Sequence, residues 1–299
     1  MEIATGIEQF LNYVQYEKRY AENTIVSYRT DLLQAQVFFE KEMSIVQIDE
    51  ITPAAARSWM ASLKNEEDDC AKTIRRKISS LKSFFRFHLK EGNVRSTPLS
   101  SLILPRPSKR LPSFLTEKET EKFNEPEETP PAKPWDLKNQ TLLIRILYET
   151  GMRRDELIHI EINNIDKTNG QLKVLGKGNK ERILPVSNDL MAAIETYIQE
   201  KPTAEQGHPY LLVLENGKAL YPKYVYNIVR NYLKGITSLK KKSPHLLRHT
   251  FATQLLNNGA DLNAVKELLG HASLAATQVY THNTIEKLKS VFKQAHPKA

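Results

Sequence analysis

Apolar positions in the first 92 residues recur at the spacing of helices. Each run places three or four apolar side chains on one face, which is typical of amphipathic helices packed around a core. The third run opens with a threonine cap followed by a proline, and Gly92 closes the fourth. The predicted helices cover residues 7–14, 25–39, 53–63 and 72–91. The sequence therefore predicts an N-terminal helical domain over residues 1–92.

The fourth predicted helix has an apolar face and a basic face. At about 100° per residue, the apolar residues Ile74, Ile78, Leu81, Phe85 and Leu89 share one arc, and six cationic side chains share another roughly 120° away. Charged faces are usually just solvated. This one has no acidic residues at i,i+4 spacing, which favours contact with phosphate groups. The residues expected to contact DNA are Lys72, Arg75, Arg76, Lys82, Arg86 and Lys90.

A proline-rich stretch then interrupts the helical pattern. Four prolines between positions 98 and 112 stand among serines and basic residues, so residues 93–113 are expected to form a linker. The remaining residues, 114–299, mix helical and strand-like patterns. Within them, "QLKVLGKGNKERILPV" holds two short apolar runs around Gly176-Lys177-Gly178-Asn179, which predicts a β-hairpin.

Several helix ends in the second half are marked by caps and glycines. One helix ends at Gly151, one begins with Ser243 as cap and Pro244 as first residue, and one runs from Asp261 to Gly270. Two further helical runs follow, the first holding Tyr280 and the second covering residues 284–295. The expected fold class is mainly α with a small antiparallel β-hairpin or sheet.

Composition narrows the class of protein. The chain has 299 residues, a net charge of +8 and one cysteine, Cys70, so a disulfide framework within the chain is excluded and a cysteine-based zinc site is disfavoured. No segment approaches the ~20 apolar residues of a membrane helix, and the N-terminus does not resemble a signal peptide, so we expect a cytosolic protein. Residues 72–110 hold 11 basic residues and one acid, and residues 216–260 hold eight and none. Two such stretches indicate a polyanionic partner.

Four segments carry residues that could do chemistry: "TGMRRDEL", "GKGNKER", "HLLRHT" and "LLGHAS…VYTH". His245 and Arg248 share a helix face in the first turn, where backbone N–H groups and the dipole already favour an anion. Local capping by His245 explains that pair equally well. Arg153, Lys177 and His271 would each, taken alone, be ordinary surface residues. It is the recurrence of Arg, Lys, His and Tyr at successive element ends that points to a common site.

These residue types suit attack on a phosphodiester. Its negative charge grows in the transition state, and bidentate arginines neutralise that charge. A tyrosine is about 0.1% ionised at pH 7, and nearby cations or a base increase its nucleophilicity. A histidine can exchange a proton with an adjacent oxygen, and a lysine can protonate a leaving 5′ oxygen.

The chain resembles the tyrosine recombinase (integrase) family, and within it the bacterial Xer branch. The likeness runs from "TIVSYRTDLLQ" through "GKGNKER" and "LRHTFAT" to "QAHPKA". It implies a SAM-like helical core-binding domain at 1–92 and a mixed α/β catalytic domain at 114–299. Asp155 and Gln254 depart from residues common in the family, at positions with no catalytic role there. The resemblance implies that the catalytic residues are Arg153, Lys177, His245, Arg248, His271 and Tyr280, with Lys177 as general acid and Tyr280 as nucleophile.

The same resemblance implies how the protein works. The two domains would clamp duplex DNA at a specific site, and Tyr280 would form a 3′-phosphotyrosine and release a 5′-hydroxyl. Strand exchange would pass through a Holliday junction within a homo- or hetero-tetramer, with no metal or other cofactor. Resolution of chromosome dimers in the bacterial cytoplasm, at the nucleoid, is the expected role, and a septal DNA translocase is a candidate partner. Residues 284–295 would form an exchange helix on a neighbouring protomer, the alternative being packing against their own domain.

Other functions remain open from the residues alone. His245 and His249 have the spacing of a helical zinc pair, although Arg248 would place a cation beside the metal. A DNA-binding protein without chemistry would keep the basic stretches and form no covalent adduct. A type IB topoisomerase would share the chemistry without pairing two sites. An integrase or transposase-type recombinase of a mobile element is a closer alternative to the Xer interpretation than a topoisomerase is.

Overall fold

The protein forms two compact units, residues Met1–Arg110 and Leu111–Ala299. The structure is a computed structural model that describes residues 1–65, 67, 69–106, 113–124, 133–176, 180–202, 209–270, 292, 294 and 295. Helices dominate both units, and the second unit adds a small antiparallel sheet, as the sequence predicted. Within the described ranges, no helix combines the length and the apolar character needed to cross a membrane.

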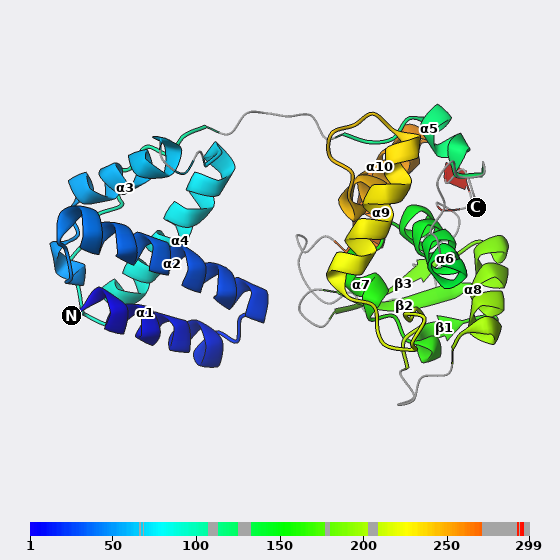
Figure 1. The fold of residues 1–299 in the computed structure, drawn as a ribbon, viewed down its shortest axis with the longest axis horizontal. Coiled ribbons are helices and arrows are strands. Elements are labelled where there is room, and N and C mark those ends of the chain that lie inside the picture. Colours follow the sequence, from blue (N-terminus) through cyan, green and yellow to red (C-terminus); the bar gives the residue numbers. More distant parts are fainter. Residues whose placement is uncertain are drawn as a thin grey trace. The chain divides into compact units, whose positions relative to one another are not determined.

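The first unit is built from four α-helices (Figure 1), and aromatic side chains contribute to its core. A turn of π-helix, Tyr13–Glu17, follows the first α-helix, and a turn of 3-10 helix, Ile48–Glu50, follows the second. Phe10, Phe39 and Trp59 are almost fully buried, so apolar burial holds this unit together. The α-helices are α1 (Ile3–Asn12), α2 (Glu22–Met43), α3 (Pro53–Asn65) and α4 (Ala71–Lys90).

Part of the stretch expected to be a linker packs on this unit. The side chains of Val94, Leu99 and Leu102 are buried in the same core as the four helices. Gly92, with a φ of 74°, turns the chain after α4 so that these residues fold back onto the core. The compact unit therefore continues past residue 92, where the sequence placed its end.

A neutral histidine is buried in the first unit. His88 on α4 is completely buried, its Nε2 lies 3.1 Å from the carbonyl oxygen of Gly6, and its Nδ1 lies 3.0 Å from the Asn93 amide nitrogen. Burial lowers the pKa of His88, because desolvation disfavours the charged ring. With Nε2 donating to the Gly6 carbonyl and Nδ1 accepting from Asn93, both ring nitrogens of the neutral imidazole are satisfied.

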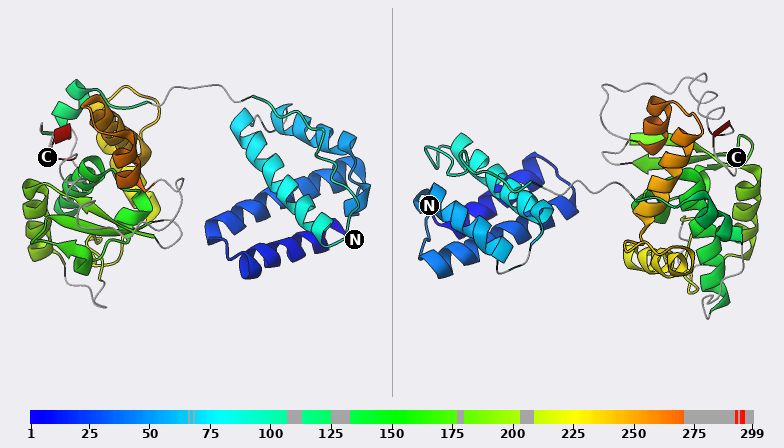
Figure 2. Two further views of the ribbon diagram at one scale, coloured as in Figure 1. Left: turned by 180° about the vertical axis from the view of Figure 1, so that it is seen from behind. Right: turned by 90° about the horizontal axis from the view of Figure 1, so that it is seen from above.

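The second unit packs helices on one side of its three-stranded sheet (Figure 2), and in the described part of the chain the other side is open, as the exposed Lys173 and Leu175 of the central strand show. The strands are β1 (Ile165–Asp166), β2 (Gln171–Gly176) and β3 (Lys180–Pro185), antiparallel in the order β1-β2-β3. Gly176 pairs with Lys180, so the predicted hairpin is confirmed, with residues 177–179 of its turn outside the described residues. The helices are α5 (Glu117–Glu121), α6 (Pro134–Thr150), α7 (Arg154–Ile158), α8 (Asn188–Glu200), α9 (Pro222–Ile236), α10 (Pro244–Asn257) and α11 (Leu262–Leu269), with 3-10 turns at Lys122–Asn124 and Ile162–Asn164.

Helix α6 lies at the centre of the unit and fixes where the site forms. It packs against α8, α9 and α10, and it ends at Gly151 with a φ of 60°. A Cβ atom at Gly151 would lie 2.3 Å from the Phe251 ring, so glycine permits both the turn and the close approach of α6 to α10. This approach brings the start of α7 next to α10.

The C-terminal tail contributes three described residues. Phe292 and Ala295 are buried in the core of the second unit, and the Asn258 side chain donates a 2.6 Å hydrogen bond to the Ala295 carbonyl. These contacts are made within one chain. They correspond to the alternative in which the tail packs on its own domain, whereas the exchange-helix prediction placed it on a neighbouring protomer.

Candidate active site

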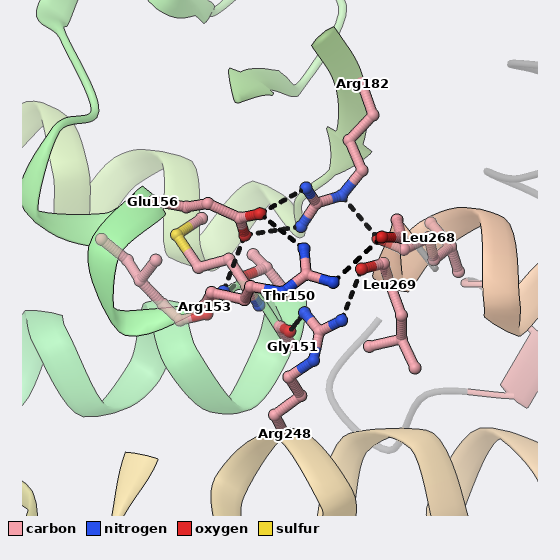
Figure 3. Close-up of polar contacts among 11 residues, drawn as sticks. Thr150, Gly151, Arg153, Glu156, Arg182, Arg248, Leu268 and Leu269 are labelled. Carbon is pink, nitrogen blue, oxygen red and sulfur yellow. Dashed lines mark hydrogen bonds and ion pairs between the residues drawn. The ribbon is translucent and has the colours of Figure 1, made fainter. Parts of the chain in front are cut away.

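Three arginines from three separate elements converge at the C-terminal end of α11 (Figure 3). Arg153 precedes α7, Arg182 lies on β3, and Arg248 lies in the second turn of α10. Arg248 and Arg182 are buried, whereas a third of the Arg153 side chain is exposed. The predicted pairing of Arg153 with Arg248 in space is thus present, together with an arginine that the sequence reading did not select.

Consecutive backbone carbonyls of α11 each accept a hydrogen bond from a different arginine. Arg182 donates through Nε to the Leu268 oxygen at 2.8 Å, and Arg153 donates through Nη2 to the Gly270 oxygen at 2.9 Å. Arg248 donates to the Leu269 oxygen between them. The last carbonyls of a helix lack partners within the helix and carry partial negative charge, so cations are stabilised there.

One carboxylate, Glu156 on α7, joins two of the arginines. It accepts two hydrogen bonds from Arg182, at 2.8 and 2.7 Å, and one from Arg153 Nη1 at 2.9 Å. The backbone N–H of Arg153 also donates to it, at 2.7 Å. Burial alone would raise the pKa of Glu156, but the hydrogen bonds and charge of Arg182, with those of Arg153, lower it below its usual range. Glu156 is therefore ionised at neutral pH.

The cluster carries an excess of positive charge. Among the described residues, Glu156 pairs with Arg153 and Arg182, while the hydrogen bonds of Arg248 go to neutral carbonyls, including Gly151 at 2.7 Å. Burial and the neighbouring Arg153 lower the pKa of Arg248 to about 10, so it still carries its proton at pH 7. Such an uncompensated cluster favours binding of an anion.

His245 lies one turn before Arg248 on the same helix, as its spacing predicted. It stands on the exposed side of α10. The pKa of His245 is lowered, mainly by partial desolvation and next by the charges of His249 and Arg248. Its ring is therefore neutral at pH 7. A neutral imidazole can accept a proton, which suits the role expected from the sequence.

The structure describes three of the six predicted catalytic residues: Arg153, His245 and Arg248. Lys177, His271 and Tyr280 lie outside the described residues. The residues directly before two of them, Gly176 and Gly270, are described and lie at the arginine cluster.

Arg182 and Glu156 were missed by the sequence reading, although each left a signal. In β3 the buried positions Arg182 and Leu184 share the inward side, so an arginine stands where the strand pattern requires an apolar residue. Glu156 is three residues after Arg153, on the same helical turn. A charged residue at an inward position next to a candidate catalytic motif was the detectable sign of both.

The basic face of α4 differs in part from the prediction. Lys72, Arg75, Arg86 and Lys90 are exposed and Lys82 is partly buried. Arg76 is paired, because its Nη1 lies 2.6 Å from the buried Asp31 carboxylate on α2, a partner that i,i+4 spacing could not reveal. Leu89, expected on the apolar face, is 42% exposed.

The second unit carries a basic groove next to the start of α10. It is lined by cations of α9 and of the loop that follows, so it offers a second positive surface on this unit. The lining residues are Tyr226, Arg230, Lys234, Lys240, Lys241, Lys242 and Ser243. In the part of the chain that the structure describes, no three histidine, cysteine or acidic side chains are grouped as metal ligands would be.

Comparison with known proteins identifies the class of protein that carries this arginine cluster and helical N-terminal unit. Residues 113–287 match the phage integrase family, and residues 7–92 match the phage integrase N-terminal SAM-like domain. The chain belongs to the phage integrase family of tyrosine recombinases.

Similar proteins include curated relatives with two names. Tyrosine recombinase XerC of Chlorobaculum parvum is 35% identical over 98% of this chain and 94% of its own length. Tyrosine recombinase XerD of Halalkalibacterium halodurans is also 35% identical, over 99% of each chain. The solved structure of the XerH site-specific recombinase bound to difH substrate, in a pre-cleavage complex, is 25% identical with a TM-score of 0.70, covering 96% of this chain and 84% of that one.

Proposed function

We propose that this protein is a site-specific tyrosine recombinase that cuts and rejoins DNA strands through a covalent protein–DNA intermediate. The observation that carries the proposal is the excess of guanidinium charge at the end of α11, beside the neutral His245. A scissile phosphate needs such a cluster, because charge accumulates on its oxygens during attack. Membership of the phage integrase family supplies the reaction class.

Arg153 and Arg248 are proposed to hold the scissile phosphate. A guanidinium has five N–H donors, and among the contacts of the described residues each side chain uses two of them. The contacts to backbone carbonyls and Glu156 fix the planes of the two groups. The donors that remain can bind phosphate oxygens in a preset orientation, which lowers the cost of ordering them during the reaction.

Tyr280 is proposed as the nucleophile. Its oxygen forms a bond to phosphorus while the bond from phosphorus to the 5′ oxygen breaks, giving a 3′-phosphotyrosine and a free 5′-hydroxyl. The tyrosine proton passes to a base, for which neutral His245 or His271 is suited, and Lys177 protonates the leaving oxygen. Attack by a 5′-hydroxyl from the partner strand reverses these steps and releases the tyrosine.

The biological role that we propose is resolution of chromosome dimers at a specific duplex site. The names XerC and XerD of the curated relatives support it, and so does the match to XerH bound to difH substrate. Strand exchange between two sites requires a tetramer, either of this chain or with a second recombinase, and a septal DNA translocase is a candidate activator. We expect the protein where the chromosome is, on the nucleoid in the bacterial cytoplasm.

A nicked suicide substrate tests the reaction directly. The wild-type protein should form a covalent adduct, seen as a shifted band on a denaturing gel, because loss of a short fragment after cleavage prevents religation. Tyr280→Phe should bind the same DNA with unchanged affinity and form no adduct. Tyr221→Phe, at an exposed tyrosine before α9, is the matched control and should still form the adduct. An adduct with Tyr280→Phe would assign the nucleophile to another residue.

A further inference from the structure

Arg182 is a buried arginine for which the proposed chemistry has no use. Only 4% of its side chain is exposed, and each of its three nitrogens has a partner: Leu268 O for Nε and the two Glu156 oxygens for Nη1 and Nη2. It cannot reach a DNA phosphate from this position. An apolar side chain of similar volume would fill the same space at no desolvation cost, so stability alone does not explain an ion pair here.

The guanidinium of Arg182 lies between two glycines that directly precede predicted catalytic residues. A Cβ atom at Gly176 would lie 3.4 Å from Arg182 Nη1, and one at Gly270 would lie 3.1 Å from the same nitrogen. Gly176 comes immediately before Lys177 in the sequence, and Gly270 immediately before His271. At Gly270 the absence of a Cβ allows the backbone to approach the guanidinium closely. At Gly176 a Cβ would touch the guanidinium and would lie 3.3 Å from the Lys180 carbonyl oxygen across the hairpin.

The partners of Arg182 come from elements that carry the other predicted site residues. Glu156 holds Arg153, and α11 accepts from Arg248 one residue beyond the carbonyl that Arg182 uses. The planar fork of arginine sets two directions at once: Nη1 and Nη2 toward α7, and Nε toward α11. A hairpin, which can twist and slide, is thereby fixed against α7 and α11 at its last described residues.

We propose that Arg182 is a positioning residue that holds the base of the β2–β3 hairpin, and with it Lys177, in register with Arg153 and Arg248. This inference rests on the proposed function. Arg182 acts through Lys177 and does not touch DNA. This single role accounts for the buried ion pair, for the close approach of Gly270 to the guanidinium, and for the inward-facing arginine on β3.

Arg182→Lys is the first test. A lysine keeps the charge, but its single ammonium cannot hold both Glu156 oxygens and the Leu268 carbonyl. The expected result is unchanged DNA affinity with single-turnover cleavage reduced about 100-fold, the effect of a misplacement of about 1 Å. Cleavage that stays within threefold of wild type would overturn the proposal, as would a loss of DNA binding equal to the loss of cleavage.

A sulfur leaving group separates positioning from a general structural defect. With a 5′-phosphorothiolate substrate the leaving group needs no proton, so the defect of Arg182→Lys should be largely rescued, as should that of Lys177→Ala. Combining the two substitutions should add little to the loss in Lys177→Ala alone. The proposal would be wrong if Arg182→Lys lost the same cleavage activity on both substrates, or if the effects of the two substitutions were fully additive. Either result would show that Arg182 only supports the fold.

A glycine variant keeps the proposal testable if Arg182→Lys does not fold. Gly176→Ala adds one methyl group against the guanidinium without removing a charge, and Gly235→Ala adds one in open space on α9 as its control. Cleavage should fall in Gly176→Ala and be recovered on the phosphorothiolate, and it should be unchanged in Gly235→Ala. Equal cleavage by both variants would contradict the positioning role. Absence of any adduct with the wild-type protein would instead reject the proposed function itself.

Discussion

Both units bury carboxylates against arginine, and Asp31 in the first unit and Glu156 in the second stand in surroundings of different charge. In the first unit, Asp31 accepts from Arg76 and from the Ser80 hydroxyl at 2.7 Å, so one carboxylate meets one half-exposed guanidinium. In the second unit, Glu156 meets Arg153 and Arg182, and Arg248 lies beside them with hydrogen bonds to carbonyls. Counted over the described residues, the first pair is balanced and the second site has two cations in excess.

The difference shows how a structural ion pair and an anion site are told apart. Both are buried, and both bridge elements distant in sequence, so burial and hydrogen bonding alone do not separate them. The balance of charge separates the two kinds of site. Burying guanidinium groups without matching carboxylates costs free energy, and a bound anion would offset that cost. By this criterion we assign the proposed phosphate site to the second unit and a structural role to Arg76.

The largest expected difference is in stability. Glu156→Gln removes the carboxylate that pairs with Arg153 and Arg182 and should cost about 3–5 kcal/mol, the usual result of breaking a buried pair. Asp31→Asn should cost about 1–2 kcal/mol, because water already solvates half of Arg76. Urea unfolding of variants that keep only Trp59 or only Trp135 reports each unit separately. Equal losses in the two units would remove the distinction between the sites.

The next expected difference is in catalysis. Arg153→Ala or Arg248→Ala should slow single-turnover cleavage by about 10²- to 10³-fold, the cost of losing one donor to transition-state charge, with DNA affinity much less affected. Arg76→Ala is the matched control and should cleave as fast as the wild type once DNA is bound. Wild-type cleavage by the Arg248 variant would show that the excess charge serves another purpose.

A smaller effect is expected for DNA binding by α4. Lys72→Glu with Arg75→Glu should weaken binding and flatten its dependence on salt, by roughly one unit of slope for each lost phosphate contact. Arg76→Ala should change the slope less, since Asp31 already neutralises it. Reversal of Lys41, exposed at the end of α2, serves as the control. A salt slope unchanged in the double variant would assign this face to solvent.

The smallest effect concerns pH. The folded state lowers the pKa of His88, so the unfolded chain takes up a proton first as pH falls below about 6.5. The first unit should therefore lose stability between pH 7 and 5.5, by at most about 1.4 kcal/mol per pH unit, until the folded state also binds the proton. Urea titrations followed through Trp59 measure this slope. His88→Gln should flatten it, and a slope unchanged by that substitution would assign the pH dependence to other groups.

Sequence patterns over a few residues predicted the helix ends and the hairpin, because neighbouring residues determine these features. Asp261 caps α11 through its side chain, Gly151 and Gly270 end their helices with positive φ, and the β2–β3 hairpin forms where its apolar runs predicted. Helices α8 and α9 were not selected, although α9 has a pronounced apolar side. Neither helix carries a residue of the candidate site.

Contacts between distant elements could not be predicted. Asp31 and Arg76 are 45 residues apart, and Glu156 and Arg182 are 26 apart, so no periodicity relates them. The excess charge of the site is likewise a sum over α7, β3 and α10. It exists only once α6 has packed against α7 and α10 and β3 has packed against α11. The residue types of the site could be found in the sequence, whereas their balance of charge required the structure.

The three arginines donate hydrogen bonds to backbone carbonyls at the end of α11, and this affects which residues of the helix can change during evolution. Every residue has the same backbone carbonyl oxygen, whatever its side chain. Side chains along α11 can therefore be substituted while the hydrogen bonds of Arg153, Arg182 and Arg248 are kept. Gly270 is the exception, because its positive φ and its contact with Arg182 leave no space for a side chain. Among descendants of one ancestor, α11 should therefore vary freely on its exposed side, for example at Lys266, while the helix length and its final glycine stay fixed.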